Sequence, residues 1–105
     1  MDKIPDSVSN IINNYLALLR DNSIPIDQAY LFGSYSKGIA GEWSDIDIAL
    51  ASKVFTGNRF RDRDMIRKYT LSVSSLLEVI PFNINDFNEG NPLAGEIIRT
   101  GIKLI

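Results

Sequence analysis

The most informative part of the sequence is the stretch Gly33-Ser34-Tyr35-Ser36-Lys37-Gly38-Ile39-Ala40-Gly41-Glu42-Trp43-Ser44-Asp45-Ile46-Asp47-Ile48-Ala49-Leu50. It follows a short apolar run, residues 29–32, and ends in residues 46–50, which are apolar apart from Asp47. Short apolar runs bounded by glycine, serine and aspartate are typical of strands buried on both faces. We therefore predict strands over residues 27–32 and 45–51, joined by one helical turn over residues 35–40 and a loop.

Hydrophobic periodicity on either side of this stretch predicts the remaining elements. A helix from about Pro5 to Asn22 has one apolar face, made of Val8, Ile11, Ile12, Tyr15, Leu16 and Leu19. A helix over about 59–71 and a strand over 76–82 follow, and Pro81 indicates that the strand ends at a sheet edge or bulge. We expect a last helix from Asn91-Pro92 to Thr100, with Gly101 as its C′ residue, and a short strand over 102–105. The inner residues of the second helix are predicted to be Phe60, Ile66, Tyr69 and Val73.

This alternating order of helices and strands predicts an α+β fold with a mixed sheet of about four strands flanked by helices. At 105 residues the chain has the length of one domain, so we expect residues 1–105 to form a single domain. Within it, the helix of about residues 5–22 precedes a core over residues 27–105. Hydrophobic residues make up 45% and charged residues 23%, which is a globular composition.

Several classes of function are excluded by composition. The chain has no cysteine and no histidine, so thiolate nucleophiles, imidazole bases and the usual zinc sites are absent. The net charge of −2 gives no overall attraction to nucleic acid. No apolar run approaches the roughly 20 residues that cross a bilayer, and the first residues lack the features of a signal peptide. These observations lead us to expect a cytoplasmic protein without membrane contact.

Two carboxylates two residues apart, Asp45 and Asp47, mark a candidate metal site. Residues i and i+2 of a strand point to the same face, so both carboxylates project together while Ile46 and Ile48 face the other side. Two like charges on one rigid surface repel each other unless a cation lies between them. Magnesium fits best, because it prefers oxygen ligands and commonly binds one or two carboxylates together with substrate phosphates.

The Gly33-Ser34 pair indicates a phosphate-binding turn. Glycine after a buried strand lets a ligand approach the backbone, and the next turn directs amide N–H groups and the Ser34 hydroxyl into the same space. The spacing of Gly33 and Gly38 matches a P-loop, but Ile39 stands where that motif requires lysine. A phosphate cradle beside paired carboxylates implies a nucleoside triphosphate and metal-assisted attack on a phosphoryl group.

Together these residues resemble the signature of the DNA polymerase beta-like nucleotidyltransferase superfamily: Gly-Ser, a spacer, then Asp-x-Asp on a strand. Ten residues separate Ser34 from Asp45, as in the minimal nucleotidyltransferase (MNT) group. The resemblance covers most of residues 25–105, including the ending Ile97-Ile98-Arg99-Thr100-Gly101-Ile102. It implies a small nucleotidyltransferase domain that moves a nucleoside monophosphate, AMP from ATP by default, to an acceptor hydroxyl. It also implies two Mg²⁺ ions and β- and γ-phosphates held at Gly33 and Ser34.

The family usually has a third carboxylate on a neighbouring strand. Glu78 is the natural candidate, because it is the only acid inside the third predicted strand. We expect Asp45, Asp47 and Glu78 to be both metal ligands and catalytic residues, with Glu78 accepting the proton of the attacking hydroxyl. Asp86 is the fallback, although its sequence context indicates a turn.

Lys37 and Ser44 are further candidates for nucleotide binding. Lys37 either approaches the triphosphate or is a solvated lysine, and Ser44 either contributes to the site or orients the loop. Ser34 is expected both to cap the following turn and to bind phosphate. Trp43 either stacks on a base or packs half-buried.

Five basic residues gather in the second helix, which permits several interpretations. They are Arg59, Arg61, Arg63, Arg67 and Lys68, interrupted by Asp62 and Asp64. The pattern fits a solvated helix with local ion pairs, a triphosphate-binding surface, or a surface for an acidic substrate or partner.

The resemblance also suggests a partner. Small MNT proteins often pair with a helical HEPN protein as antitoxin and toxin, and some transfer AMP to a tyrosine of that partner. Two alternatives remain at this point: a catalytically weak antitoxin-like partner-binding module that retains the fold, and a regulatory phosphate-binding protein. The acceptor is left open between a protein hydroxyl, a small molecule and an RNA end.

Overall fold

The computed structural model describes residues 4–41 and 43–105. Its elements are, in order, α1 (Asp6–Asp21), β1 (Gln28–Phe32), α2 (Ser34–Lys37), β2 (Ile46–Ser52), α3 (Arg59–Val73), β3 (Leu77–Asn83), the 3₁₀ turn η1 (Ile84–Asp86), α4 (Pro92–Thr100) and β4 (Ile102–Lys103). The α+β fold class and the alternating order are therefore confirmed. The boundaries of the longer elements lie within two residues of those predicted.

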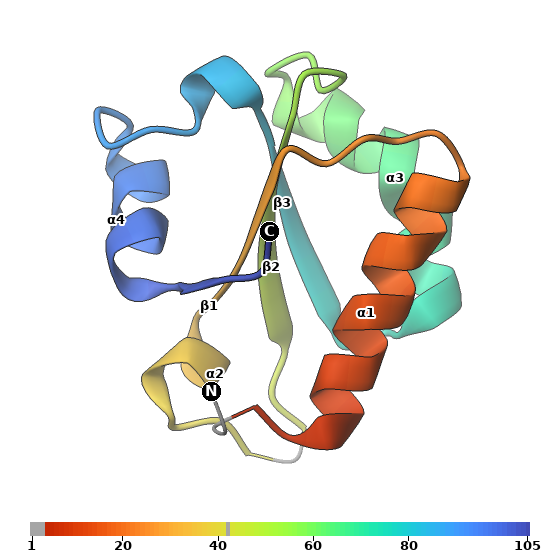
Figure 1. Ribbon diagram of the computed structural model, residues 1–105, viewed down its shortest axis with the longest axis vertical. Coiled ribbons are helices and arrows are strands. Elements are labelled where there is room, and N and C mark those ends of the chain that lie inside the picture. The colour runs from red at the N-terminus through yellow and green to blue at the C-terminus, as the bar shows by residue number, and fades with distance from the viewer. Residues whose placement is uncertain (1–3, 42) are drawn as a thin grey trace.

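The four strands form one mixed sheet in the order β3-β2-β1-β4. β1 pairs antiparallel with β2 and with β4, whereas β2 and β3 are parallel. Parallel neighbours need a crossover connection, which α3 provides between β2 and β3. Figure 1 shows that this connection places α3 on the same side of the sheet as α1.

One face of the sheet is covered by α1 and α3. Its core combines the buried stripe of α1 (Val8, Ile12, Tyr15 and Leu19) with Ile66 of α3 and with the side chains of β2 that face them, Ile46, Ile48 and Leu50. The Tyr15 hydroxyl lies 2.7 Å from Thr70 Oγ1, which joins the two helices. Burial raises the pKa of Tyr15 to about 12, despite the hydrogen bond to Thr70.

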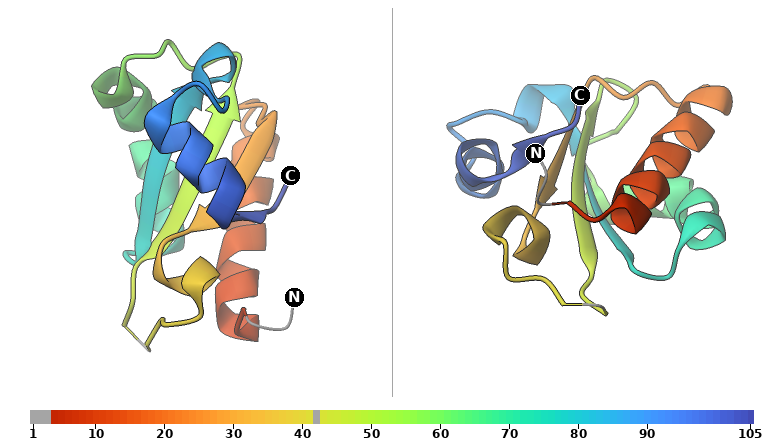
Figure 2. Two further views of the ribbon diagram at one scale, coloured as in Figure 1. Left: turned by 90° about the vertical axis from the view of Figure 1, so that its left-hand side faces the viewer. Right: turned by 60° about the horizontal axis from the view of Figure 1, so that its bottom comes forward.

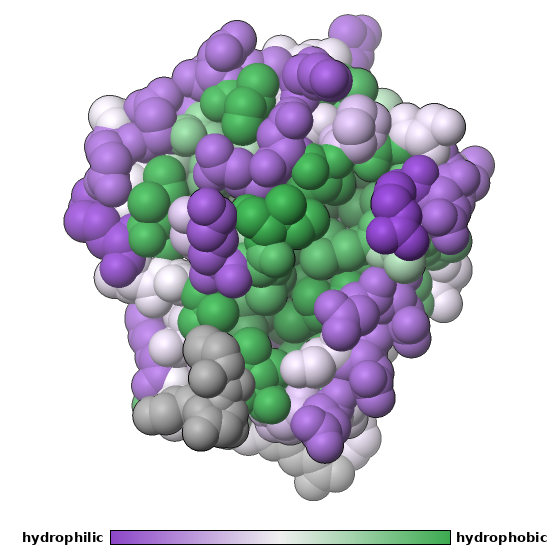
Figure 3. All heavy atoms as spheres, viewed as in Figure 1, coloured by the Kyte–Doolittle hydropathy of each residue, from purple (hydrophilic) through white to green (hydrophobic). Residues whose placement is uncertain are grey.

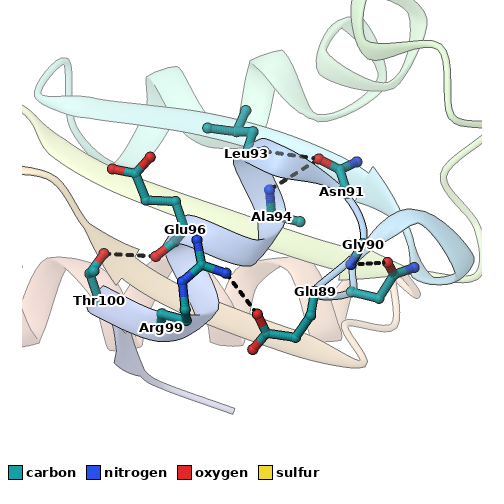
Figure 4. A network of polar contacts seen from close by, with 9 residues as sticks. Glu89, Gly90, Asn91, Leu93, Ala94, Glu96, Arg99 and Thr100 are labelled. Carbon is teal, nitrogen blue, oxygen red and sulfur yellow. Dashed lines mark hydrogen bonds and ion pairs between the residues drawn. The ribbon is translucent and has the colours of Figure 1, made fainter.

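The opposite face is partly covered by α4, packed on Tyr30, Ala49, Ala51 and Phe82. Asn91 caps this helix, since its Oδ1 accepts the N–H groups of Leu93 and Ala94 at 3.1 Å. Figure 4 shows the cap together with Arg99, whose Nη1 donates to Glu89 Oε1 at 2.9 Å. These contacts fix α4 over one end of the face, and α2 lies toward the other (Figures 1 and 2).

Figure 3 shows the surface on the side from which Figure 1 is viewed. Apolar side chains gather at its centre, with polar residues around them. Over the described part of the chain, no helix is both long enough and apolar enough to span a membrane.

The prediction that Phe60 lies inside α3 is wrong. Its side chain is 83% exposed, while Asp62 is only 1% exposed. The Asp62 carboxylate accepts hydrogen bonds from the Thr56 N–H (2.8 Å), the Thr56 hydroxyl (2.9 Å) and the Gly57 N–H (3.0 Å). Asp62 thereby ties the β2–α3 loop to the helix. In the first turn of α3, Asp62 is therefore buried and Phe60 is exposed, which is the reverse of the arrangement that hydrophobicity predicts.

Gly101 closes α4, but in extended backbone with φ −83° and ψ 175°. Glycine is favoured at this position because a Cβ would lie 2.6 Å from the Ile97 carbonyl oxygen and 3.0 Å from that of Leu31.

The expectation that Pro81 marks a sheet edge is confirmed, because β3 is an outer strand. The Ile46 N–H donates to the Leu76 carbonyl at 2.8 Å, and Ile46 pairs with Leu77. In a parallel ladder this register turns the backbone groups of Leu77, Val79 and Pro81 away from β2. The missing N–H of Pro81 therefore falls on the open side of the sheet.

Candidate active site

Three strands meet at the site. In the sheet register, Phe32 of β1 lies opposite Asp47 of β2, and Asp47 lies opposite Glu78 of β3. Neighbouring strands are about 4.8 Å apart, so the two carboxylate-bearing residues are adjacent. Asp47 shares its face with Ala49 and Ala51, whereas Ile46 and Ile48 are buried under α1 and α3. The predicted separation of Asp47 from its isoleucine neighbours is therefore confirmed.

Asp45 precedes β2 and is exposed, as is Glu78 at the start of β3. The pKa of Asp47 is raised above its ordinary value of 3.8, first by burial and then by the negative charges of Asp45 and Glu78. None of the described residues donates a hydrogen bond to the Asp47 carboxylate. The three acids thus form an electrostatically unfavourable cluster at one end of the sheet.

Gly33 lies directly against this cluster. It has φ 74°, which favours glycine, and a Cβ at this position would collide with Oδ2 of Asp47. Gly38 has the same φ, but a Cβ there would meet nothing within 4 Å. The two glycines of the turn therefore serve different purposes: Gly38 permits the backbone conformation, while Gly33 also leaves room for a carboxylate.

The structure corrects the expectation that Ser34 caps the turn. Ser34 is the first residue of α2, Gly33 occupies the N-cap position, and no side chain among the described residues caps the helix. The hydroxyl of Ser36 instead donates to the Gly33 carbonyl at 2.9 Å. Ser34 is half-buried beside the turn, and its hydroxyl makes no hydrogen bond to a described residue.

The other nucleotide-binding candidates lie in α2 and the loop after it. Lys37 is exposed in the last turn of α2. The Ser44 Oγ accepts the Gly41 N–H at 2.8 Å, which fits the interpretation that Ser44 orients the loop. Trp43 is 79% exposed, so the prediction of half-buried packing is wrong.

Asp86, the fallback for the third carboxylate, is far from the cluster. It lies in η1, beyond the end of β3 where Asn83 pairs with Ser52. Glu78 and Asn83 are five residues apart, or about 16 Å along an extended strand. Asp86 therefore belongs to the opposite end of the sheet, near Gly57 and Arg59.

The donor set at the cluster suits a hard divalent cation. Carboxylate oxygens from Asp45, Asp47 and Glu78 are the ligand type that Mg²⁺, Mn²⁺ and Ca²⁺ prefer. Within residues 4–41 and 43–105, no three acidic side chains stand in the arrangement of an assembled metal site.

A groove opens beside Glu78, between α3 and the outer strand β3. It has a volume of about 180 Å³ and is lined by Arg63, Arg67, Thr70, Leu71, Glu78 and Val79. Arg63 and Arg67 are four residues apart and share one face of α3, and in the structure both line the groove together with Glu78. The sequence alone gave no signal for this proximity, because it depends on how α3 packs against β3.

A mixed sheet with a Gly-Ser turn packed against an Asp-x-Asp strand, and a third acid on the parallel neighbour, defines a nucleotidyltransferase domain. The model of the "Polymerase beta, Nucleotidyltransferase" family matches residues 12–105, so the chain belongs to that family.

One curated relative and one solved structure are similar to this chain. Protein adenylyltransferase MntA of Shewanella oneidensis is 53% identical over 38 residues, which are 36% of this chain and 27% of MntA. This match agrees with the resemblance to the MNT group. The crystal structure of a protein from Sulfolobus solfataricus assigned as a nucleotidyltransferase superposes with a TM-score of 0.58 at 19% identity. That alignment covers 99% of this chain and 88% of the other, and it supports the fold.

Proposed function

We propose that this protein transfers a nucleoside monophosphate, AMP from ATP, to an acceptor hydroxyl in a magnesium-dependent reaction. The observation that carries the proposal is the alignment of Asp47 with Glu78 across β2 and β3, with Asp45 in electrostatic reach and Gly33 packed on Asp47. A structural role does not account for three mutually repelling carboxylates. A cation bridging them and the substrate phosphates does.

Each site residue has a proposed part. Asp45, Asp47 and Glu78 hold the metal ions, which when bound neutralise the phosphate charge and activate the α-phosphate. Gly33 lets the triphosphate approach the backbone, and the free hydroxyl of Ser34 binds its β- and γ-phosphates. Lys37, exposed one turn later, supplies positive charge to the triphosphate. Ser44 maintains the conformation of the loop before Asp45.

The reaction balances as a single substitution at phosphorus. The acceptor oxygen forms a bond to the α-phosphorus, and the bond from that phosphorus to the bridging oxygen of the β-phosphate breaks. Pyrophosphate leaves, and Glu78 takes the proton of the hydroxyl. Most of the rate would come from positioning and charge neutralisation.

The acceptor is proposed to be a protein hydroxyl. This rests on the MntA match, since that relative is described as a protein adenylyltransferase. A helical HEPN-type toxin is the proposed partner, through the resemblance to MNT proteins that act as antitoxins. The competing function, a partner-binding module without useful turnover, predicts binding that is independent of the carboxylates.

Incubation with α-labelled ATP and Mg²⁺, with a cell extract as the source of acceptors, tests the proposal. We expect label on a macromolecule, lost in Asp45→Ala and retained in Asp21→Ala, which removes an exposed carboxylate at the end of α1. If wild type and Asp45→Ala label equally, or if ATP binds equally with and without Mg²⁺, the carboxylates are not the catalytic centre.

A further inference from the structure

Apart from Glu78, the residues that line the groove between α3 and β3 have no part in the proposed reaction. Arg63 and Arg67 stand one turn apart in α3 and line it together with Glu78. Arg67 Nη1 lies 3.1 Å from Asp64 Oδ1, and both side chains are more than half exposed. Arg63 makes no ion pair with any described residue. The groove therefore offers two guanidinium groups at the outer strand that carries Glu78.

The order of groups across the sheet indicates the side from which an acceptor would approach. The Gly33-Ser34 turn follows β1, Asp47 stands on β2, Glu78 stands on β3, and the groove lies at the β3 side. Figure 2 (left) shows β3 as the outer strand on this side. In an in-line displacement the nucleophile and the leaving group occupy opposite sides of the phosphorus. With the phosphates at Gly33-Ser34, the nucleophile arrives from the side of Glu78 and the groove.

The size of the groove limits what enters it. Pockets that enclose a small-molecule ligand have volumes of about 300–1,000 Å³. The groove, at about 180 Å³, accommodates one side chain of a larger acceptor. Beside it, the register turns the backbone of Val79 toward the open edge of the sheet, where an extended segment can pair.

We propose that this groove docks an acidic, hydroxyl-bearing segment of a protein acceptor. Arg63 and Arg67 bind carboxylates of the segment, because guanidinium groups pair with carboxylates through two parallel hydrogen bonds. Its hydroxyl side chain then reaches Glu78. The proposed docking site is inferred from the groove alone. The delivery of the hydroxyl to the α-phosphate rests on the proposed function.

Two random copolymers serve as probes, one of glutamate and tyrosine and one of lysine and tyrosine, each carrying a fluorophore. Binding is measured by fluorescence anisotropy without nucleotide, and ATP binding with Mg²⁺ is measured separately. The test variant is Arg63→Glu/Arg67→Glu. The control is Arg61→Glu, an exposed arginine two residues before Arg63 and so on another face of α3.

Wild type is expected to bind the acidic copolymer at least about tenfold more tightly than the basic one, because guanidinium groups attract carboxylates and repel ammonium groups. The double variant should lose that preference and still bind ATP, whereas Arg61→Glu should keep both. The docking site is refuted if wild type prefers the basic copolymer, binds neither, or binds the acidic one undiminished in the double variant. Arginine-dependent binding of a single-stranded RNA in preference to the acidic copolymer also overturns it, in favour of a nucleic-acid acceptor.

The same data separate this proposal from the proposed function. Acidic binding that depends on Arg63 and Arg67, without Mg²⁺-dependent ATP binding, supports the groove and overturns the transferase. ATP binding and labelling that are intact in the double variant, with the acidic copolymer labelled as well as by wild type, support the transferase and overturn the groove.

Discussion

Two aspartates on the two sides of this sheet have opposite environments. Asp62 is 1% exposed, yet its carboxylate accepts three hydrogen bonds from Thr56 and Gly57. Asp47 is only half-buried, but it faces Asp45 and Glu78 and its pKa is raised. The more deeply buried charge is therefore the better stabilised one.

The difference separates a structural acid from the acid that we propose to be functional. A carboxylate whose acceptor positions are filled by nearby donors has its partners inside the chain. A carboxylate held among like charges by a rigid strand costs stability, and such groups concentrate at functional sites where a ligand supplies the missing charge. The fraction of a side chain that is buried therefore does not distinguish the two kinds of acid.

Removal of the structural acid should have the largest effect on stability. We expect Asp62→Ala to lower the free energy of unfolding by about 3 kcal/mol, because it leaves the donors of Thr56 and Gly57 without their acceptor. Asp64→Ala, which loses only an exposed ion pair with Arg67, should cost less than about 0.5 kcal/mol. Urea denaturation measures the free energy of unfolding of both variants. Equal losses of stability would contradict the structural role of Asp62.

At Asp47, the proposed functional acid, the glycine pair of the turn provides a sharper test. Gly33→Ala should lower kcat/KM for nucleotidyl transfer by about 100-fold, because the new Cβ displaces the Asp47 carboxylate. Gly38→Ala carries the same backbone strain at φ 74° without the collision, so its rate should stay within a few-fold of wild type. Equal losses in the two variants would assign the effect to backbone strain.

A neutral buried group extends the comparison. Tyr15→Phe should cost about 1 kcal/mol, since it removes the hydroxyl that joins α1 to Thr70 of α3. Wild type should also lose stability above pH 10, because the folded-state pKa of Tyr15 is raised from 10.0 to about 12 and its ionisation favours unfolding. Thermal unfolding at pH 9 and pH 11 measures this loss, which Tyr15→Phe should not show.

The smallest effect is expected at Asp47 itself, without metal. A raised folded-state pKa means that Asp47 stabilises the fold at low pH and loses that contribution as the pH rises above 3.8. At pH 7 without divalent cations, Asp47→Asn should therefore be more stable than wild type, by about 0.5 kcal/mol after solvent screening.

Magnesium should reverse this order, because it would stabilise only the carboxylate form. Melting temperatures with EDTA and with MgCl₂ measure both states. If Asp47→Asn is less stable than wild type in EDTA, the carboxylate is not repelled by its neighbours.

The elements of the fold were predictable because periodicity reports burial directly. The stripe from Val8 to Leu19 and the apolar strands pack as expected. The inward position of Phe60 was not predicted correctly, since the orientation of α3 is set by hydrogen bonds to Asp62 from a loop that carries no hydrophobic signal. Trp43 fails for a similar reason: an aromatic residue in a loop packs only if another element reaches it.

At the candidate site, the sequence predicted residues but not which of them lie beside one another. Spacing alone places Asp45 and Asp47 near one another. The alignment of Glu78 with Asp47 depends on the parallel register after a crossover of about 25 residues, which no local pattern fixes. The proximity of Arg63 and Arg67 to Glu78 also required the packed helix.

The position of Pro81 has a consequence for self-association. An outer strand with open backbone groups is a template on which copies of a protein can stack edge to edge into aggregates. On β3 the template is interrupted, because Pro81 presents no N–H on the open side just after Val79. A short segment of another chain can pair with β3 before Pro81, but a continuous intermolecular sheet cannot extend along the strand. Replacement of Pro81 by valine would restore the donor and should favour fibril-like aggregation at high protein concentration.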